Sequence, residues 1–401
     1  MIEWLERADP DSVFLDVPGA TVTYGEMAAL VADRPVGSAA ETLRPFADVD
    51  SVVDIFAVAG RGRAVLVTPS LDTDPVVGGG EAATIVFTSG TSGSPSPVRL
   101  TRANWGAAVA ASTDHLGNTA DDTWLCVLPL YHVGGLSILF RSAYVGGTVR
   151  LLPGFGADLT ARELHDVSIA SLVPTMLARV LDSDPGPYQG LAAVLVGGGP
   201  IPDGLLERAH ASGIPALPSY GMTETCAQIA TLRPGSPPQR RAHLLPGVEL
   251  RIEPDGRIAV RGDQVSLGYA GEPDRPRGEW LVTGDLGEID DDGALRVLGR
   301  ADGVIVSGGE NIDPVAVEQV VETHPDVPAA VVVGLASEEW GMEAACAYSG
   351  EIDPEDLRRW ARERLDGFMV PKRWLRVEQV PVTALGKPDR VAARGLFSSA
   401  E

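Results

Sequence analysis

Residues 87–101 read F-T-S-G-T-S-G-S-P-S-P-V-R-L-T, and the predicted fold is organised around this stretch. It follows an apolar run at residues 82–87, which predicts a buried strand, and it precedes residues 104–111, which predict a helix. A strand, a loop of glycine and hydroxyl residues, and a helix together turn backbone N–H groups outward, which suits phosphate binding. Gly90 and Gly93 permit a positive φ and a close approach of a ligand. The pattern G-x-x-x-x-G-K-[ST] is absent, so this loop is not that of the common NTPases.

The bulk composition excludes several classes of partner. The chain has 401 residues, 44% of them hydrophobic and 22% charged, which is ordinary for a soluble globular protein of two or three domains. Its formal charge of -23 would repel nucleic acid and anionic membranes, so neither is expected as a partner. No apolar run is long enough for a membrane span, and the first residues do not resemble a signal peptide. With only three isolated cysteines, we expect reduced thiols and a cytoplasmic protein.

The middle of the chain predicts an α/β fold. Between residues 123 and 217, short apolar runs alternate with helical stretches, which indicates a large N-terminal domain of parallel α/β sheets. Three loops rich in glycine or serine, which begin at Phe87, Gly197 and Pro218, follow strands of this kind. Because ligands bind beyond the carboxyl ends of parallel strands, we expect these loops to face one crevice. Residues 69–80, rich in proline, aspartate and glycine, predict a linker.

The last third of the chain has a different texture. Short strands with turns at Asp255-Gly256 and Asp292-Gly293 predict a small antiparallel β unit that still belongs to the first domain. Beyond Arg300, helices at residues 314–323 and 354–365 alternate with strands at 329–334, 343–348 and 374–377. We therefore predict a domain at residues 1–301, followed by a small mobile α+β domain at residues 302–401.

Several blocks of sequence resemble one family. These are the stretch from Thr88 to Thr101, Y-G-M-T-E-T at residues 220–225, T-G-D-L-G at 283–287, and the segment from G-R-A-D at 299–302 through S-G-G-E-N-I at 307–312. They are similar to motifs of the adenylate-forming superfamily, which includes acyl-CoA synthetases, adenylation domains and luciferases. P-V-T-A-L-G-K at residues 381–387 resembles the family's C-terminal lysine loop. The resemblance implies that a carboxylate attacks ATP to give an acyl-adenylate and pyrophosphate, and that a thiol, usually coenzyme A, then displaces AMP.

The resemblance also implies a role for individual residues of this chain. The residues expected to hold the nucleotide phosphates are Thr88, Ser89, Gly90, Thr91 and Ser92, with Thr223 on the α-phosphate. Those expected around the adenine and ribose are Gly198, Gly199, Ser219, Tyr220, Gly221, Asp285 and Arg300. Glu224 would hold Mg²⁺, which prefers carboxylate oxygen. Gly308 and Gly309 would line the thiol tunnel, and Asp302 would be the hinge between the domains.

Lysine is used sparingly in this sequence. It occurs only at Lys372 and Lys387, whereas arginine is abundant. A compact ammonium is therefore kept for special positions, and the resemblance implies that Lys387 reaches the carboxylate and the α-phosphate in the first step. The phosphate loop departs from the family, because Pro95 is followed by Ser96 and Pro97 where a lysine is usual. The loop thereby loses a cation, and Pro97 lacks a backbone donor.

The sequence of the acid-binding region reads L-P-L-Y-H-V-G-G-L-S-I-L-F-R at residues 128–141. It is most similar to the o-succinylbenzoate–CoA ligases of menaquinone biosynthesis, and the short region before the phosphate loop fits the same branch. Their substrate carries two carboxylates, and Arg141, on an otherwise apolar helix, is expected to pair with the one that is not activated. His132 is expected to be a gate or wall of the pocket, and Ser219 and Gln228 to line it. The implied small molecules are 2-succinylbenzoate, ATP and coenzyme A, and the sequence leaves a homodimer open.

Three alternatives stay open from the sequence. The chain is a CoA ligase for this acid or another aryl or acyl group, a stand-alone adenylating enzyme that loads a carrier protein, or a non-catalytic nucleotide-binding homologue. The last is suggested only by Ser96 and Pro97.

Overall fold

The computed structural model describes residues 1–37, 41–43, 45–68, 81–88, 96–199, 201–202, 204–301, 303–307, 310–337, 341–383 and 386–398. The predicted linker at residues 69–80 and the candidate residues Ser89, Gly90, Thr91, Ser92, Asp302, Gly308 and Gly309 lie outside the described residues. The chain forms two compact units. The larger contains most residues up to Thr283 together with Glu288–Val297, and the smaller contains Gly284–Gly287 and the chain from Leu298 onward. The predicted functional boundary between residues 301 and 302 stays a prediction.

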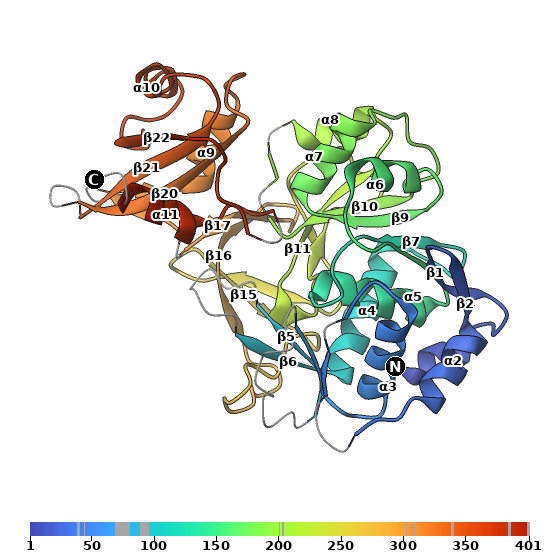
Figure 1. The fold of residues 1–401 in the computed structure, drawn as a ribbon. Helices are drawn as coiled ribbons and strands as arrows, with labels where there is room; N and C mark the ends of the chain where they lie inside the picture. The colour runs from blue at the N-terminus through green and yellow to red at the C-terminus, as the bar shows by residue number, and fades with distance from the viewer. Residues whose placement is uncertain are drawn as a thin grey trace. The chain divides into compact units, whose positions relative to one another are not determined.

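The larger unit is built on a nine-stranded sheet. Its order is β13-β12-β11-β10-β9-β7-β8-β1-β2, and the neighbouring strands β11, β10, β9, β7, β8 and β1 run parallel to one another, as the sequence predicted (Figure 1). The three strands β2, β12 and β13 are antiparallel additions at the two edges. The strands are β1 (Val13–Val17), β2 (Ala20–Thr23), β7 (Thr123–Cys126), β8 (Thr148–Leu151), β9 (Ile169–Leu172), β10 (Ala193–Gly197), β11 (Ala216–Tyr220), β12 (Ala230–Thr231) and β13 (His243–Leu244).

Helices cover both faces of this sheet, because its strands are apolar on both sides. Along β7, Trp124 and Cys126 pack against one group of helices, while Leu125 and the following Val127 pack against the other. This alternation follows from the two-residue period of a strand. The first group is α1 (Ile2–Arg7), α2 (Tyr24–Asp33), α3 (Val49–Gly60), α4 (Arg102–Leu116) and α5 (Val133–Val145). The second group is α6 (Ala157–Glu163), α7 (Pro174–Ser183) and α8 (Leu205–Ala211) (Figure 1).

The strand before the phosphate loop belongs to a separate sheet, which the sequence did not indicate. The order β3-β4-β5-β6 joins β3 (Glu41–Leu43), β4 (Val65–Val67), β5 (Ala82–Phe87) and β6 (Pro97–Thr101). The predicted β5 is confirmed, but the chain returns as the antiparallel β6 before α4 begins. Pro97 is tolerated at the start of β6 because this strand lies at the edge of its sheet. The Trp105 indole of α4 donates to Thr84 of β5 over 2.9 Å and so joins the helix to this sheet.

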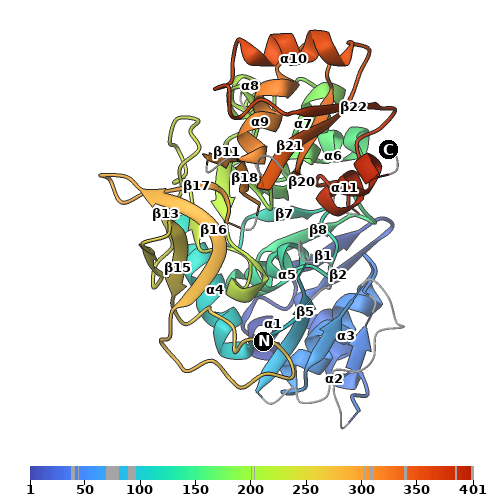
Figure 2. The same ribbon diagram turned by 90° about the vertical axis from the view of Figure 1, so that its left-hand side faces the viewer.

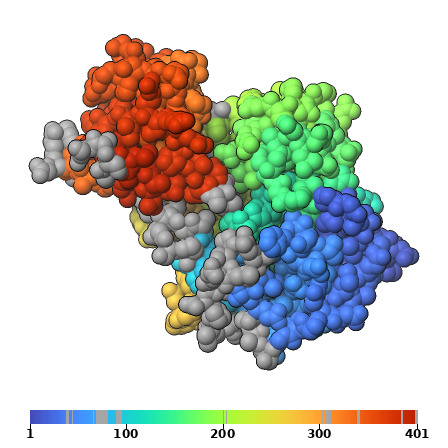
Figure 3. All heavy atoms as spheres, in the orientation of Figure 1, coloured from blue at the N-terminus to red at the C-terminus, as the bar shows by residue number. Residues whose placement is uncertain are grey.

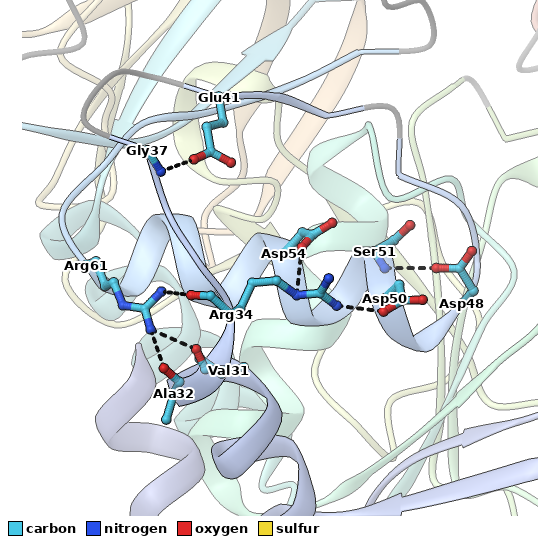
Figure 4. Close-up of polar contacts among 10 residues, drawn as sticks. All are labelled: Val31, Ala32, Arg34, Gly37, Glu41, Asp48, Asp50, Ser51, Asp54 and Arg61. Atoms are coloured by element: carbon cyan, nitrogen blue, oxygen red, sulfur yellow. Dashed lines mark hydrogen bonds and ion pairs between the residues drawn. The ribbon is translucent and has the colours of Figure 1, made fainter.

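The C-terminal end of α2 is held by charged side chains (Figure 4). Arg61, just after α3, donates to the carbonyl oxygens of Ala32 (2.7 Å) and Arg34 (2.5 Å), which a helix end leaves unpaired. Arg34 in turn lies 2.6 Å from Asp50 and 3.1 Å from Asp54, both on α3. These contacts join α2 to α3. In the space-filling view, the N-terminal part of the larger unit, coloured blue, adjoins its green part (Figure 3).

A small sheet follows in the order β14-β15-β16-β17. Its strands are β14 (Glu249–Ile252), β15 (Arg257–Arg261), β16 (Leu281–Ile289) and β17 (Leu295–Arg300), and the division between the compact units runs through the last two. β14 and β15 are antiparallel, as predicted. Gly256 and Gly293 adopt φ values of 83° and 75°, which explains the glycine in each predicted Asp-Gly turn.

In its described residues, the smaller unit is a five-stranded sheet covered by three helices. Its strands are β18 (Ile305–Ser307), β19 (Glu310–Ile312), β20 (Ala329–Ser337), β21 (Gly341–Ser349) and β22 (Arg373–Val377). Helices α9 (Pro314–Glu322) and α10 (Pro354–Arg362) pack on one face, and α11 (Arg390–Ser398), which the sequence did not indicate, packs on the other (Figure 2). In the order β19-β18-β21-β20, β20 stands at the end and therefore has one outer edge.

Two further expectations concern the whole chain. Cys126, Cys226 and Cys346 are all buried, and none of the three is paired in a disulfide. Among the residues that the structure describes, no helix is both long enough and apolar enough to cross a membrane.

Candidate functional site

The loops after β10 and β11 lie side by side. Gly197, the last residue of β10, pairs in register with Ser219 of β11. A Cβ atom at Gly197 would lie 2.6 Å from the Ser219 carbonyl oxygen, so the close approach requires glycine. Gly198 follows with a φ of 80°, in the region that favours glycine. Two of the three predicted loops therefore meet, although β11 extends to Tyr220, so Ser219 and Tyr220 are strand residues rather than loop residues.

A tight turn follows Tyr220 and contains Thr223 and Glu224. A Cβ atom at Gly221 would lie 1.4 Å from the Ala227 carbonyl oxygen, so no other residue fits here without rearrangement. Cys226 and Ala227 have φ values of 53° and 83°, which are unusual for residues other than glycine. Such strained backbone concentrates at functional sites, where the surrounding structure holds it in place. The turn contains a short 3₁₀ helix, η1 (Thr223–Thr225).

Glu224 is held in place by residues 266–270, a segment that lies outside the sequence motifs. The Tyr269 hydroxyl donates to Glu224 Oε1 over 2.8 Å, and the backbone N–H of Ser266 donates to the Glu224 carbonyl over 2.8 Å. Burial raises the pKa of Tyr269, and the charge of Glu224 raises it further, so the phenol stays a donor. Within the described residues, Glu224 Oε2 has no hydrogen-bond partner. One carboxylate oxygen is therefore fixed, and the other is available.

The same segment connects Glu224 with the end of the phosphate loop. Tyr269 forms a β-bridge with Val98 of β6, and the N–H of Ala270 donates to the Pro97 carbonyl over 2.8 Å. Thr88 and Ser96, the two described ends of the loop, form hydrogen bonds with each other. The N–H of Thr88 donates to the Ser96 carbonyl over 2.9 Å, and the N–H of Ser96 donates to Thr88 Oγ1 over 3.1 Å. Ser96, the residue after Pro95, therefore pairs with Thr88 at the base of the loop.

A buried hydrogen-bond chain links the two candidate acid-binding residues Ser219 and Gln228. Ser112 of α4 donates to Gln228 Oε1 over 2.7 Å, and Gln228 Nε2 donates to Thr231 Oγ1. Thr231 Oγ1 donates in turn to Ser219 Oγ over 3.0 Å. Gln228 is 4% exposed and both ends of its amide have internal partners. Its role in acid binding stays a prediction.

His132 lies just before α5, and Arg141 lies within this helix. His132 precedes the helix, half-buried, with its ring 4.6 Å from that of Tyr131. Arg141 comes more than two turns later, about 13 Å along the helix axis. It is 3% exposed, and its Cζ lies 5.1 Å from the centre of the Trp124 ring.

The guanidinium of Arg141 is buried without a counter-charge. No hydrogen bond or ion pair joins it to any residue in the described part of the chain. Burial lowers the pKa of Arg141 to about 9, because desolvation disfavours the charged guanidinium. The face of the Trp124 ring offsets only part of that cost. An unpaired buried charge is costly, and an anionic ligand would offset that cost.

The smaller unit brings three further candidates together. Arg300 NH1 lies 3.4 Å from Asp285 Oδ1, and the Asp285 side chain is 17% exposed. A Cβ atom at Gly284 would lie 2.6 Å from Arg300 NH2, so glycine makes room for this pair. Burial lowers the pKa of Lys387, while the Asp285 carboxylate opposes that shift and Arg300 adds to it. The three charged groups are therefore close enough to interact.

Sequence reasoning missed Tyr269, Ser112 and the strained Ala227. None of them stands in a recognised sequence motif. Tyr269 and Ser112 contact residues that are far away in the sequence, and Ala227 follows a tight turn. Tyr269 had only a weak signal, since it follows Gly268 in an irregular segment. That segment is positioned by pairing with β6, far away in sequence.

Comparison with known proteins agrees with this architecture. A solved structure of o-succinylbenzoate CoA synthetase (MenE) from Bacillus subtilis, in complex with the acyl-adenylate intermediate OSB-AMP, is 28% identical with a TM-score of 0.86. The match covers 98% of this chain and 97% of that one. The structure of the Bacillus subtilis enzyme in complex with ATP and magnesium ion is also 28% identical, with a TM-score of 0.82 and coverage of 97% and 98%.

Sequence comparison gives the family. The chain is 41% identical over 330 residues to a 2-succinylbenzoate–CoA ligase of Bacillus licheniformis, which covers 77% of this chain and 68% of that protein. Residues 316–387 match the AMP-binding enzyme C-terminal domain, and residues 26–270 match the AMP-binding enzyme family itself. The predicted superfamily is confirmed: the chain belongs to the AMP-binding enzymes.

Proposed function

We propose that this protein is a 2-succinylbenzoate–CoA ligase of menaquinone biosynthesis. It would activate the acid with ATP to an acyl-adenylate and pyrophosphate, and then transfer the acyl group to coenzyme A with release of AMP. The observation that carries this proposal is the 41% identity with the ligase of Bacillus licheniformis over 330 residues. The likeness to the Bacillus subtilis synthetase that was solved with its acyl-adenylate supports the same two-step reaction.

The nucleotide roles are carried over from the family motifs. We propose that Thr88 and the loop after it hold the phosphates, that Thr223 contacts the α-phosphate, and that Tyr220 stacks on the adenine. Asp285 and Arg300 would hold the ribose hydroxyls. The room beside Gly198 and Gly199, where an added Cβ atom would meet nothing nearer than 3.6 Å, supports an adenine slot here, because a flat base could come near the backbone.

Glu224 suits a magnesium ion. Mg²⁺ is usually bound through one or two carboxylates together with substrate phosphates, so a single oriented carboxylate is sufficient. Tyr269 fixes one oxygen of Glu224, and such outer hydrogen bonds orient the ligands of metal ions. When bound, the ion would neutralise phosphate charge as the carboxylate approaches. Lys387, in the smaller unit, would provide the ammonium that stabilises charge on the α-phosphate and the acid.

Arg141 supports a substrate with two carboxylates. One carboxylate must reach the α-phosphate to react, so a buried cation elsewhere in the acid pocket would hold the other. The lack of any acceptor for Arg141 among the described residues favours an anion from outside the chain. His132, at the start of the same helix, would form the wall of the pocket nearer the reacting group.

One assay tests the proposal directly. Purified protein is incubated with 2-succinylbenzoate, ATP, Mg²⁺ and coenzyme A, and the products are identified by mass. We expect 2-succinylbenzoyl-CoA with AMP and pyrophosphate, and the acyl-adenylate with pyrophosphate when coenzyme A is omitted. Lys387→Ala serves as the control for the activation step.

The other outcomes separate the alternatives. An adenylate that forms but passes only to a carrier-protein thiol would indicate a stand-alone adenylating enzyme. Thioesters with other acids but none with 2-succinylbenzoate would indicate a different acyl-CoA synthetase. No pyrophosphate release with any acid from folded protein would indicate a nucleotide-binding homologue without activity.

A further inference from the structure

The segment that carries Lys387 is closed into a narrow loop. The N–H of Thr383 donates to the Lys387 carbonyl over 2.7 Å, and the N–H of Lys387 donates back to Thr383 Oγ1 over 3.3 Å. The N–H of Asp389 donates to the Pro381 carbonyl over 2.9 Å, and Val382 forms a β-bridge with Pro388. The backbone of Lys387 is therefore fixed relative to the residues that follow it.

Those residues are anchored in turn. Asp389 Oδ1 accepts from the N–H groups of Val391 and Ala392, which caps the first turn of α11. Arg390, the first residue of α11, places NH2 at 2.7 Å from Glu318 Oε1 and 2.6 Å from Oε2. Only two residues, Pro388 and Asp389, separate Arg390 from Lys387. The strength of such a pair comes from its charge-assisted hydrogen bonds.

Glu318 is itself immobilised. It is 4% exposed on α9, and its Oε1 also accepts from the N–H of Val332 over 2.7 Å. Val332 lies on β20, so this bond pairs a backbone donor at the outer edge of the sheet. Glu322, one turn further along α9, accepts from the N–H of Ala330 on the same strand over 3.0 Å. Glu318 therefore joins three parts of the smaller unit: α9, the edge of β20, and the start of α11.

We infer that Glu318 and Arg390 are positioning residues for Lys387, so that loss of the pair displaces its ammonium and slows acyl-adenylate formation. The catalytic part of this inference rests on the proposed function. The pair is not needed to attach α11, because Ala393 and Phe397 are buried in an apolar cluster against β20 and β21. A displacement of about 1 Å is enough to lower a rate about 100-fold.

A spectroscopic test needs no substrate. Because the chain has only two lysines, reductive ¹³C-methylation gives two lysine signals, and Lys387→Arg assigns them. Methylation keeps the positive charge. In Glu318→Gln, we expect the Lys387 signal and its titration to shift while the Lys372 signal stays in place. Glu343→Gln, which breaks the 2.7 Å pair with Arg373 in the same unit, is the matched control and should move only Lys372 or neither signal.

A kinetic test follows the two half-reactions separately. With 2-succinylbenzoate, we expect Glu318→Gln to lower ATP–pyrophosphate exchange about 10- to 100-fold, with little change in KM for ATP. The rate of acyl-CoA formation from supplied acyl-adenylate and coenzyme A should change much less. Arg390→Lys should recover part of the exchange rate, and Glu318→Gln should have no further effect in the Lys387→Ala background.

Each result decides the question. An unmoved Lys387 signal, or equal losses in both half-reactions together with a lower unfolding temperature, would make the pair purely structural and overturn the inference. If the unmodified protein shows no exchange with 2-succinylbenzoate, the proposed function fails. The lysine signals would still decide whether the pair positions Lys387.

Discussion

Glu224 receives its hydrogen bond from Tyr269, and this contact determines how the carboxylate is presented. A phenol with a raised pKa remains a neutral donor through the physiological range, so it orients Glu224 without competing for its charge. Arg141 shows the opposite situation, since its charge is buried without an acceptor in the described residues. These arrangements support the proposal that Glu224 binds a cation and Arg141 an anion.

Tyr269→Phe should weaken the response to magnesium. The change removes one hydroxyl from the second layer around the proposed ion, and such changes cost about 10-fold or more in metal affinity or activity. We expect the Mg²⁺ concentration for half-maximal pyrophosphate exchange to rise by about that factor. Tyr144→Phe, at an exposed tyrosine of α5, is the control. An unaltered Mg²⁺ dependence would remove Tyr269 from the proposed site.

Arg141→Ala should remove the preference for a diacid. Loss of one partner of a buried charge pair costs about 2–5 kcal/mol, so kcat/KM for 2-succinylbenzoate should fall at least about 30-fold. The rate with an aryl acid that lacks the second carboxylate should change little, and ATP binding should persist. Arg141→Met keeps most of the volume and guards against misfolding. Equal losses for both acids would argue against a contact with the spectator carboxylate.

Buried polar contacts join individual helices to residues that are far away in the sequence. Ser112 brings α4 to Gln228, which precedes β12, and Glu318 brings α9 to the edge of β20. Both contacts are buried, so each replaces water completely and leaves a costly unpaired group when one partner is lost. Such contacts fix the position of an element that apolar packing alone would allow to slide.

Ser112→Ala should show whether the buried chain to Ser219 matters for the acid. The variant leaves Gln228 Oε1 without its donor, so we expect the free energy of unfolding to fall by about 1–3 kcal/mol. If Gln228 lines the acid pocket, KM for the acid should also rise while KM for ATP stays constant. Denaturant unfolding and steady-state kinetics measure the two effects. A stability change with constant KM values would make Gln228 a structural residue only.

The pH dependence of stability should reveal Glu318. Burial raises the pKa of Glu318 from the ordinary 4.5 to about 7, although Arg390 opposes the shift and Glu322 and Asp313 add to it. The folded chain then holds this proton more tightly than the unfolded chain. The contribution of Glu318 to the free energy of unfolding is therefore lost as pH rises from about 4.5 to about 7.

Glu318→Gln removes that proton-binding group. The unfolding temperature of the original protein minus that of the variant should therefore decrease between about pH 5 and pH 8. Calorimetry at several pH values measures this difference. A difference that stays constant or grows with pH would contradict the raised pKa.

The protein as a whole combines a strongly negative charge with a function that requires two anions to meet. The formal charge is -23, so the anionic substrates must be met by local donors and by a few placed cations. The chain divides into two compact units, and the candidate residues are shared between them, with Glu224 and Arg141 in one and Lys387 in the other. Both units have counterparts in the AMP-binding enzymes.

Asp302→Pro should distinguish the two half-reactions. We propose Asp302 as a hinge, and proline would restrict its φ to about −65°. If the smaller unit changes its position between acid activation and thioester formation, one half-reaction should slow far more than the other. Pyrophosphate exchange and single-turnover thioester formation measure the two. Asp291→Pro, in the turn between β16 and β17, offers a comparison, and equal effects on both steps would reject the hinge.

The sequence by itself determined the elements and the motifs. Apolar period and turn residues predicted β5, the parallel strands from β7 to β10 and the Asp-Gly turns, because these depend on neighbouring residues. It also predicted the superfamily, since the motifs hold their order along the chain. Tertiary structure alone decided that β5 lies in a separate sheet, that Tyr269 reaches Glu224, and that Glu318 meets Arg390. Each of these depends on strand pairing or helix packing between distant segments, and local propensity carries no information about which distant segments meet.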